Sequence, residues 1–214
     1  MKLRSLAALL LTIAALCGCA TSTDAVLDTV RFAARRDADV DRAQLNPNFR
    51  YLRVFNRGRL ALLALGNVDR QAGGPVEVWY SAEHEVVRLQ NGRLAGAVGL
   101  TTEWRSVVLP PLPKWSELAQ AGTPYRWTRT RDVMPGYRYG VRDALELRRI
   151  DPPERSQLVG IDASQLAWFE EHTEHLPVAR YAVELRDGAQ TVVYGEQCLS
   201  QDVCFSWQRW DAKK

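Results

Sequence analysis

The stretch Glu85-Val86-Val87-Arg88-Leu89-Gln90-Asn91-Gly92-Arg93-Leu94-Ala95-Gly96-Ala97-Val98-Gly99 decides the fold. Two runs rich in apolar residues flank Asn91-Gly92, a dipeptide that readily adopts the positive φ angles of a two-residue hairpin turn. Residues 85–90 and 93–99 are therefore predicted to be antiparallel strands joined by a tight turn. No other hairpin signal in the chain is as strong.

Similar runs continue on both sides of this hairpin, roughly every ten residues from Phe49 onward, with turn residues between them. In residues 138–149 apolar and charged side chains alternate, which is typical of a strand with one buried and one solvated face. The expected strands are residues 51–56, 59–65, 76–80, 85–90, 93–99, 102–109, 124–131, 138–149, 179–186, 191–196 and 203–210. Because such a sheet must hide its edges, we predict a mainly β fold, an antiparallel sheet closed as a barrel or a sandwich.

Two segments favour helix and one is ambiguous. Val26, Val30 and their neighbours recur at helical spacing, which predicts an N-terminal α-helix over about residues 24–36. A short helix is expected at residues 115–120, after a proline-rich break. Residues 164–172 fit either a helix or a strand.

The first residues are typical of a secreted bacterial lipoprotein. Lys2 and Arg4 precede an apolar stretch that is too short to span a bilayer, as in a signal peptide. It ends in Leu16-Cys17-Gly18-Cys19, which resembles the lipobox at which a cysteine is acylated and the chain is cut. We expect residues 1–18 to be removed and Cys19 to be lipidated.

This processing sets the expected organisation and location. Residues 19–214 are predicted to form a single β-rich domain on a short lipidated tether. Ala20 stands where an aspartate would resemble the signal for retention in the inner membrane. We therefore expect anchoring in the outer membrane, on its periplasmic side.

The composition excludes several classes of protein. The 214 residues are 46% hydrophobic and 25% charged, with a formal net charge of +3. A disordered chain, a collagen-like repeat, a coiled coil and a multi-span membrane protein do not have this composition. Removal of the signal peptide takes Lys2 and Arg4 away and brings the charge closer to zero, so we expect no nucleic-acid partner.

The cysteines also fit an exported protein. Cys17 would be lost with the signal peptide and Cys19 acylated, which leaves Cys198 and Cys204. Disulfides persist in oxidising compartments, so a disulfide between Cys198 and Cys204 is expected.

Four segments together are similar to one known family. They are the lipobox at Cys19, Asn46-Pro47-Asn48-Phe49-Arg50-Tyr51-Leu52, Leu60-Ala61-Leu62-Leu63-Ala64-Leu65-Gly66-Asn67-Val68-Asp69, and Val78-Trp79-Tyr80-Ser81 leading to residues 88–94. With them the chain resembles the YjbF/GfcB family of bacterial lipoproteins, associated with exopolysaccharide and group 4 capsule production. The resemblance implies a mainly β fold and a role in making, exporting or retaining a surface polysaccharide. It implies no catalytic residues.

No catalytic signature is present in the sequence. It has no Gly-x-Ser-x-Gly elbow, no His-Glu-x-x-His and no phosphate-binding glycine loop. We therefore expect no enzyme activity, no cofactor and no metal. Two alternatives stay open. A glycan hydrolase needs two converging carboxylates, for which Glu77, Glu103 and Glu196 lie beside aromatics. A lipid or lipoprotein carrier needs an open apolar barrel interior.

Aromatic and basic residues are the candidates for binding. Sugar rings stack on tryptophan, and of the seven tryptophans Trp115, Trp79 and Trp104 are singled out, Trp115 first because it follows a proline-rich break. An arginine-rich stretch suits an acidic polysaccharide or anionic lipid headgroups. Its candidate residues are Arg126, Arg129, Arg138 and Arg142. We expect an accessory lipoprotein that binds polysaccharide or proteins of the export apparatus.

Overall fold

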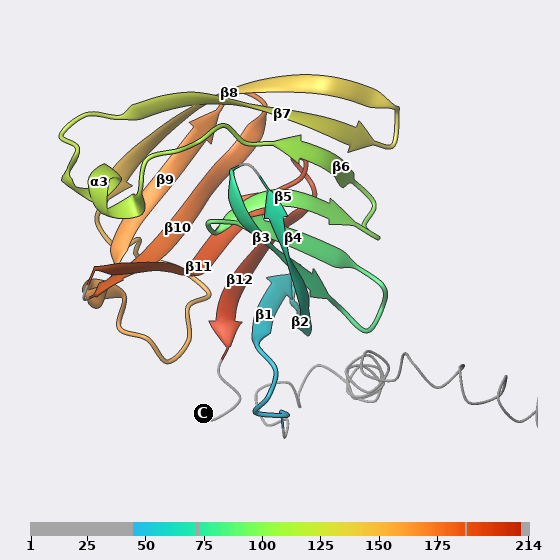
Figure 1. The fold of residues 1–214 in the computed structure, drawn as a ribbon, viewed down its shortest axis with the longest axis horizontal. Coiled ribbons are helices and arrows are strands. Elements are labelled where there is room, and N and C mark those ends of the chain that lie inside the picture. The colour runs from blue at the N-terminus through green and yellow to red at the C-terminus, as the bar shows by residue number, and fades with distance from the viewer. Residues whose placement is uncertain (1–44, 72, 187, 211–214) are drawn as a thin grey trace, which may run out of the picture.

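The computed structural model describes residues 45–71, 73–186 and 188–210, and in them the chain forms a closed antiparallel β-barrel (Figure 1). The strands are β1 (Tyr51–Asn56), β2 (Arg59–Gln71), β3 (Gly74–Tyr80), β4 (Val86–Gln90), β5 (Arg93–Val98), β6 (Glu103–Val108), β7 (Tyr125–Met134), β8 (Arg138–Ile150), β9 (Ala167–Thr173), β10 (Leu176–Arg186), β11 (Ala189–Cys198) and β12 (Cys204–Trp210). Each strand pairs with its neighbours in sequence, and β1 pairs with β12 to close the barrel. The closed β fold is confirmed, and it is a barrel.

The signal peptide, Cys19 and the predicted helix over residues 24–36 lie outside the described residues. Within the described residues the single α-helix is α3 (Trp115–Gln120), as predicted. No helix in residues 45–71, 73–186 or 188–210 is long and apolar enough to cross a membrane.

The Asn91-Gly92 turn joins β4 to β5 as predicted. Asn91 has a φ of 50° and Gly92 a φ of 78°, the left-handed conformations that this turn requires. Gly92 is also needed for space, because a Cβ atom on it would overlap the side chain of Val192. The turn is therefore held against the interior face of β11.

Two elements differ from the sequence prediction. The predicted strand at residues 59–65 continues to Gln71, because a bulge between Leu65 and Asn67 lets pairing with β3 resume beyond Gly66. The ambiguous segment at residues 164–172 is mainly strand. A short 3₁₀ turn, η2 (Ala163–Gln165), capped by the carboxylate of Asp162, leads into β9.

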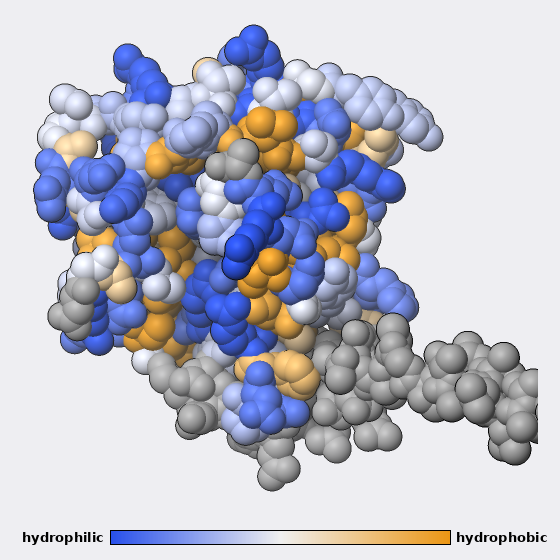
Figure 2. Space-filling model, viewed as in Figure 1, coloured by the Kyte–Doolittle hydropathy of each residue, from blue (hydrophilic) through white to orange (hydrophobic). Residues whose placement is uncertain are grey.

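Apolar side chains pack on both faces of the sheet. The main core fills the barrel interior and includes Trp79, Trp104 and Trp207, each at most 1% exposed. A second cluster around Trp168 and Tyr194 lies on the outer face of β9–β11, where residues 151–166 cover it. The visible face of the molecule is therefore largely hydrophilic, with separate apolar spots (Figure 2).

Candidate functional site

The three tryptophans predicted to bind a glycan all lie inside the barrel. Trp79, Trp104 and Trp115 are 0%, 1% and 3% exposed. The indole Nε1 of Trp104 donates to the Leu199 carbonyl at 3.0 Å, and that of Trp115 donates to the Asn91 carbonyl at 3.1 Å. None of these rings offers a face to a sugar at the surface, because strand alternation points Trp79 and Trp104 inward and α3 packs Trp115 into the barrel.

The basic stretch divides between the two faces of the β7–β8 hairpin. Arg129, predicted to lie on a basic surface, is instead 6% exposed and points into the barrel, as does Arg131. Arg126, Arg138 and Arg142 are exposed. Alternation along β7 separates Arg126 from Arg129, since residues three apart on a strand face opposite sides.

Asp143 holds the two inward arginines. Its Oδ2 accepts hydrogen bonds from Arg129 Nε at 2.7 Å and Arg131 Nε at 2.6 Å, and its Oδ1 accepts one from Arg131 Nη2 at 3.0 Å. Burial opposes ionisation of Asp143, but the hydrogen bonds and charges of Arg131 and Arg129 outweigh it and lower the pKa of the carboxyl below 3.8. The two guanidiniums also lie 4.5 and 4.7 Å from the Trp104 ring centroid, so the cluster is part of the core.

A second polar group lies next to it. Arg93 Nε is 3.8 Å from Glu171 Oε2, and Tyr181 Oη is 3.2 Å from Glu171 Oε1. Burial and the Glu171 charge raise the pKa of Tyr181 well above 10.0. Glu171 also borders a cavity of about 10 Å³ between Trp104 and Arg129, roughly the space of one water molecule. In this described part of the interior, packed side chains occupy the space where a lipid carrier would need an open apolar cavity.

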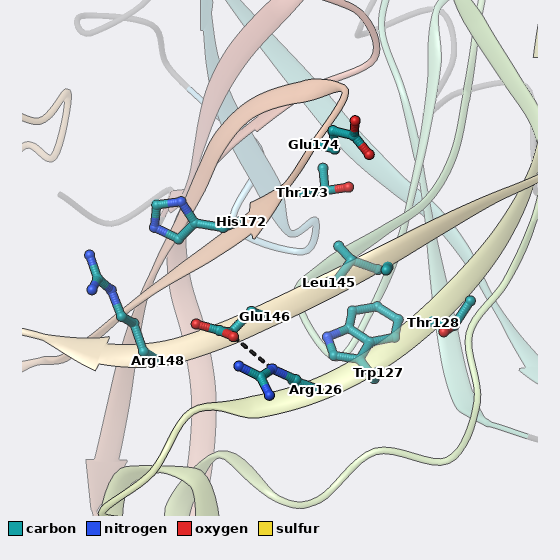
Figure 3. A pocket seen from close by; sticks show the side chains of 10 residues that line it. Arg126, Trp127, Thr128, Leu145, Glu146, Arg148, His172, Thr173 and Glu174 are labelled. Carbon is teal, nitrogen blue, oxygen red and sulfur yellow. Dashed lines mark hydrogen bonds and ion pairs between the residues drawn. The ribbon is translucent and has the colours of Figure 1, made fainter.

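An open groove of about 680 Å³ lies on the outer side of β7, β8 and β9. It forms where β9 ends at Thr173 and the chain turns away from β8. Figure 3 shows side chains from all three strands around it. The lining residues are Arg126, Trp127, Thr128, Ala144, Leu145, Glu146, Arg148, His172, Thr173 and Glu174. We call this the outer groove.

Most of the charges in the outer groove are paired. Arg126 Nε donates to Glu146 Oε2 at 2.8 Å, the pair joined by a dashed line in Figure 3. Glu170, at the edge of the groove, accepts from Arg148 Nε at 2.7 Å and lies 2.9 Å from His172 Nε2. Burial opposes its ionisation, but the hydrogen bonds of His172 and Arg148 outweigh this and lower the pKa of Glu170. The groove is therefore a dense array of donors and acceptors with little free charge.

Beyond the groove, β8 continues to the tip of the β7–β8 hairpin. β8 pairs with β9 only from Glu146 to Ile150, so residues 138–145 pair with β7 alone. In Figure 1 this hairpin runs across the top of the view. At its tip Tyr137 and Tyr139 are 75% and 66% exposed, the most exposed of the large aromatic side chains in the described residues. We call Tyr137, Arg138, Tyr139 and Arg142 the hairpin tip.

The carboxylates considered for a hydrolase are not brought together. Glu77 pairs with Arg209 inside the barrel, at 2.7 Å. Glu103 pairs with Arg105, and Glu196 with Arg180 and the Tyr194 hydroxyl. Among the described residues no three His, Cys, Asp or Glu side chains lie close enough to hold a metal ion.

The disulfide is in place. Cys198 and Cys204 are bonded across the turn that joins β11 to β12, where they are also cross-strand partners. The prediction from cysteine number and compartment is confirmed.

A family model matches residues 27–182 and is described as "Group 4 capsule polysaccharide lipoprotein gfcB, YjbF". The chain belongs to the YjbF family. The resemblance seen in the sequence is thereby confirmed, and a YjbF-family lipoprotein is a protein anchored to a membrane. No curated protein matches this YjbF-family chain in sequence.

A solved structure with a similar fold is also described as that of a lipoprotein. It is the crystal structure of the hypothetical lipoprotein YmcC from Escherichia coli K12, with a TM-score of 0.57 and 15% sequence identity. The match covers 84% of this chain and 91% of that one. At this identity the likeness concerns the fold alone.

The exposed residues of the site were missed by sequence reasoning. Tyr137 and Tyr139 are the most exposed aromatic side chains in the described residues, and the buried Trp127 borders the groove although the chosen tryptophans do not. The Pro135-Gly136 turn could have indicated that Tyr137 and Tyr139 are exposed, because residues beside the turn of a long hairpin lie on the surface.

Proposed function

We propose that this YjbF-family lipoprotein is a non-catalytic accessory in the production or export of a capsule or exopolysaccharide. It is anchored through Cys19 to the outer membrane, on the periplasmic side, and holds a segment of the polysaccharide in the outer groove. The family supports the polysaccharide, and the sequence at Cys19 supports the anchor.

The observation that carries this proposal is the composition of the outer groove. Sugars present many hydroxyl groups and small apolar C–H faces, so their sites combine polar side chains with aromatic ones. Here Thr128 and Thr173 and the Arg126–Glu146 pair surround one open groove, and the largely buried Trp127 borders it.

Groove shape also favours a polymer over a small molecule. Ala144 and Leu145 line the groove on β8, and beyond Ala144 this strand continues toward the hairpin tip without a partner in β9. A chain can therefore enter and leave along the strand. Glu77, Glu103 and Glu196 each pair with a different arginine and do not converge on one site, which supports binding without hydrolysis.

The test is binding of the surface polysaccharide extracted from the source cells to the mature lipidated chain in detergent. Ala144→Tyr places a bulky ring on the floor of the groove, and a tyrosine is well tolerated in a strand. Ala61→Tyr is the matched control, an exposed strand alanine on β2. We expect Ala144→Tyr to weaken binding by at least about tenfold, equivalent to about 1.4 kcal/mol. Equal binding by both variants contradicts the proposal.

A further inference from the structure

Charges along the outer face of β8 are unevenly paired. Arg142, Ala144, Glu146 and Arg148 alternate with the inward side chains of β8, and the last three line the outer groove. A bulge between Arg138 and Val141 breaks this alternation, so Arg138 at the tip pairs with Val133 instead of continuing the outward row. Within the groove each arginine has a carboxylate partner. Beyond it, Arg138 and Arg142 have no hydrogen bond or ion pair with any described residue.

The free guanidiniums stand beside free aromatic rings. Tyr137 and Tyr139 flank Arg138 in sequence, and both are mostly exposed. Asp132, the nearest carboxylate on β7, accepts the Gly140 backbone N–H at 2.8 Å and so is used by the turn itself. The hairpin tip therefore offers two unpaired positive charges and two rings on a segment that projects past β9.

We propose that the hairpin tip binds acidic sugar residues of the same polysaccharide that lies in the outer groove. This inference rests on the proposed function. Arg138 and Arg142 pair with its carboxylates, and Tyr137 and Tyr139 stack on its rings. The groove recognises hydroxyl groups and the tip recognises charge. The ligand is thus a polymer that contains uronic acids or similar carboxylated sugars.

Distance along the strand fits one continuous chain. Arg142 and Glu146 are four residues apart on β8, about 14 Å at ~3.4 Å per residue, and the bulge then leads on to Arg138 at the tip. Arg142 is the next outward residue beyond Ala144, at the end of the groove. A polymer that leaves the groove along β8 therefore meets Arg142 first and the tyrosines last.

Two variants separate the rings from the charges. Tyr137→Asn with Tyr139→Thr removes both rings, and asparagine suits the left-handed backbone of Tyr137, whose φ is 51°. Arg138→Gln with Arg142→Gln removes both charges. Arg59→Gln, an exposed arginine in the β1–β2 turn region, is the matched control.

The experiment compares native surface polysaccharide of the source cells with the same polymer after chemical reduction of its carboxyl groups. We expect the Arg138→Gln, Arg142→Gln variant to bind the native polymer at least about tenfold more weakly than the wild type does. We expect the wild type to bind the carboxyl-reduced polymer more weakly than the native one by a similar factor. Because both remove the same contact, their effects should not add when they are combined. The tyrosine variant should weaken binding of long chains but not of short fragments that fill only the groove.

The outcomes distinguish the two proposals. If both tip variants bind the native polymer as the wild type does while Ala144→Tyr binds weakly, the tip has no role and the groove keeps its own. Undiminished binding of the carboxyl-reduced polymer overturns the acidic ligand. If wild-type protein binds neither polymer, the groove proposal fails together with this one.

Discussion

The guanidinium carbon of Arg93 lies 3.9 Å from the centroid of the Trp115 ring, inside the end of the barrel that α3 covers. Phe169 and Tyr181 also contact this ring, at centroid distances of 5.0 and 5.3 Å. Trp115 is therefore a core residue that fixes a short helix to the barrel.

This packing predicts a loss of stability when Trp115 is truncated. Trp115→Ala should lower the free energy of unfolding by about 3–5 kcal/mol, because it leaves a cavity beside Phe169 and exposes the buried face of Arg93. Urea unfolding followed by circular dichroism measures it. Tyr139→Thr, at the exposed tip, serves as the control and should change stability by less than about 0.5 kcal/mol. A fully stable Trp115→Ala protein would contradict this packing role.

Asp143 predicts how stability depends on pH. Its pKa in the folded barrel is below 3.8, so the carboxylate contributes stability that is complete above its unfolded pKa. That contribution is lost as the pH falls through the folded pKa, when Arg129 and Arg131 lose their charged partner. Urea unfolding between about pH 6 and about pH 3 should show this decline.

Substitution isolates the contribution of that carboxylate. Asp143→Asn should be destabilised by about 3–5 kcal/mol at neutral pH, because two buried guanidiniums lose their counter-charge. Its decline in stability on acidification should be smaller than that of the wild type. Asp202→Asn, at an exposed turn position, should follow the wild type at every pH. Identical pH profiles for Asp143→Asn and wild type would refute the assignment.

The Cys198–Cys204 disulfide predicts a modest stabilisation. It closes a short loop at the β11–β12 turn, so its loss should cost about 2 kcal/mol through the entropy of the unfolded chain. Cys198→Ser with Cys204→Ser, compared in urea with the wild type under oxidising and reducing conditions, gives the value. The variant should be insensitive to reductant. A wild-type protein whose stability is the same in both conditions would count against the disulfide.

Lipidation at Cys19 predicts where the protein is found. Mass spectrometry of the mature N-terminus should show an acylated Cys19, and Cys19→Ala should move the protein from the membrane fraction to the soluble fraction. Cys17→Ala is the matched control and should stay with the membrane, because Leu16 and Gly18 leave the site at Cys19 intact. An unmodified Cys19, or a mature chain that begins elsewhere, would refute this.

The barrel could be predicted from local signals. The Asn91-Gly92 turn and the alternation along β8 depend only on neighbouring residues, and the turn is as expected, as is the alternation from Val141 onward. Nearer the tip, a bulge between Arg138 and Val141 interrupts it. Alternation along β7 also predicts that Arg129 points into the barrel. The clustering of arginines in the sequence hides this difference between Arg129 and its exposed neighbours. The outer groove could not be predicted, because it results from β9 ending at Thr173 while β8 continues. That difference in strand length is a property of the whole sheet.

Surface polysaccharide on cells that lack this gene tests the central claim most directly. The deletion strain is complemented with wild type, Ala144→Tyr or the control Ala61→Tyr, each checked for equal protein in the membrane. We predict that wild type and Ala61→Tyr restore surface polysaccharide and that Ala144→Tyr does not. Normal polysaccharide in the uncomplemented deletion strain, or full restoration by Ala144→Tyr, would contradict the claim that this lipoprotein acts through its outer groove.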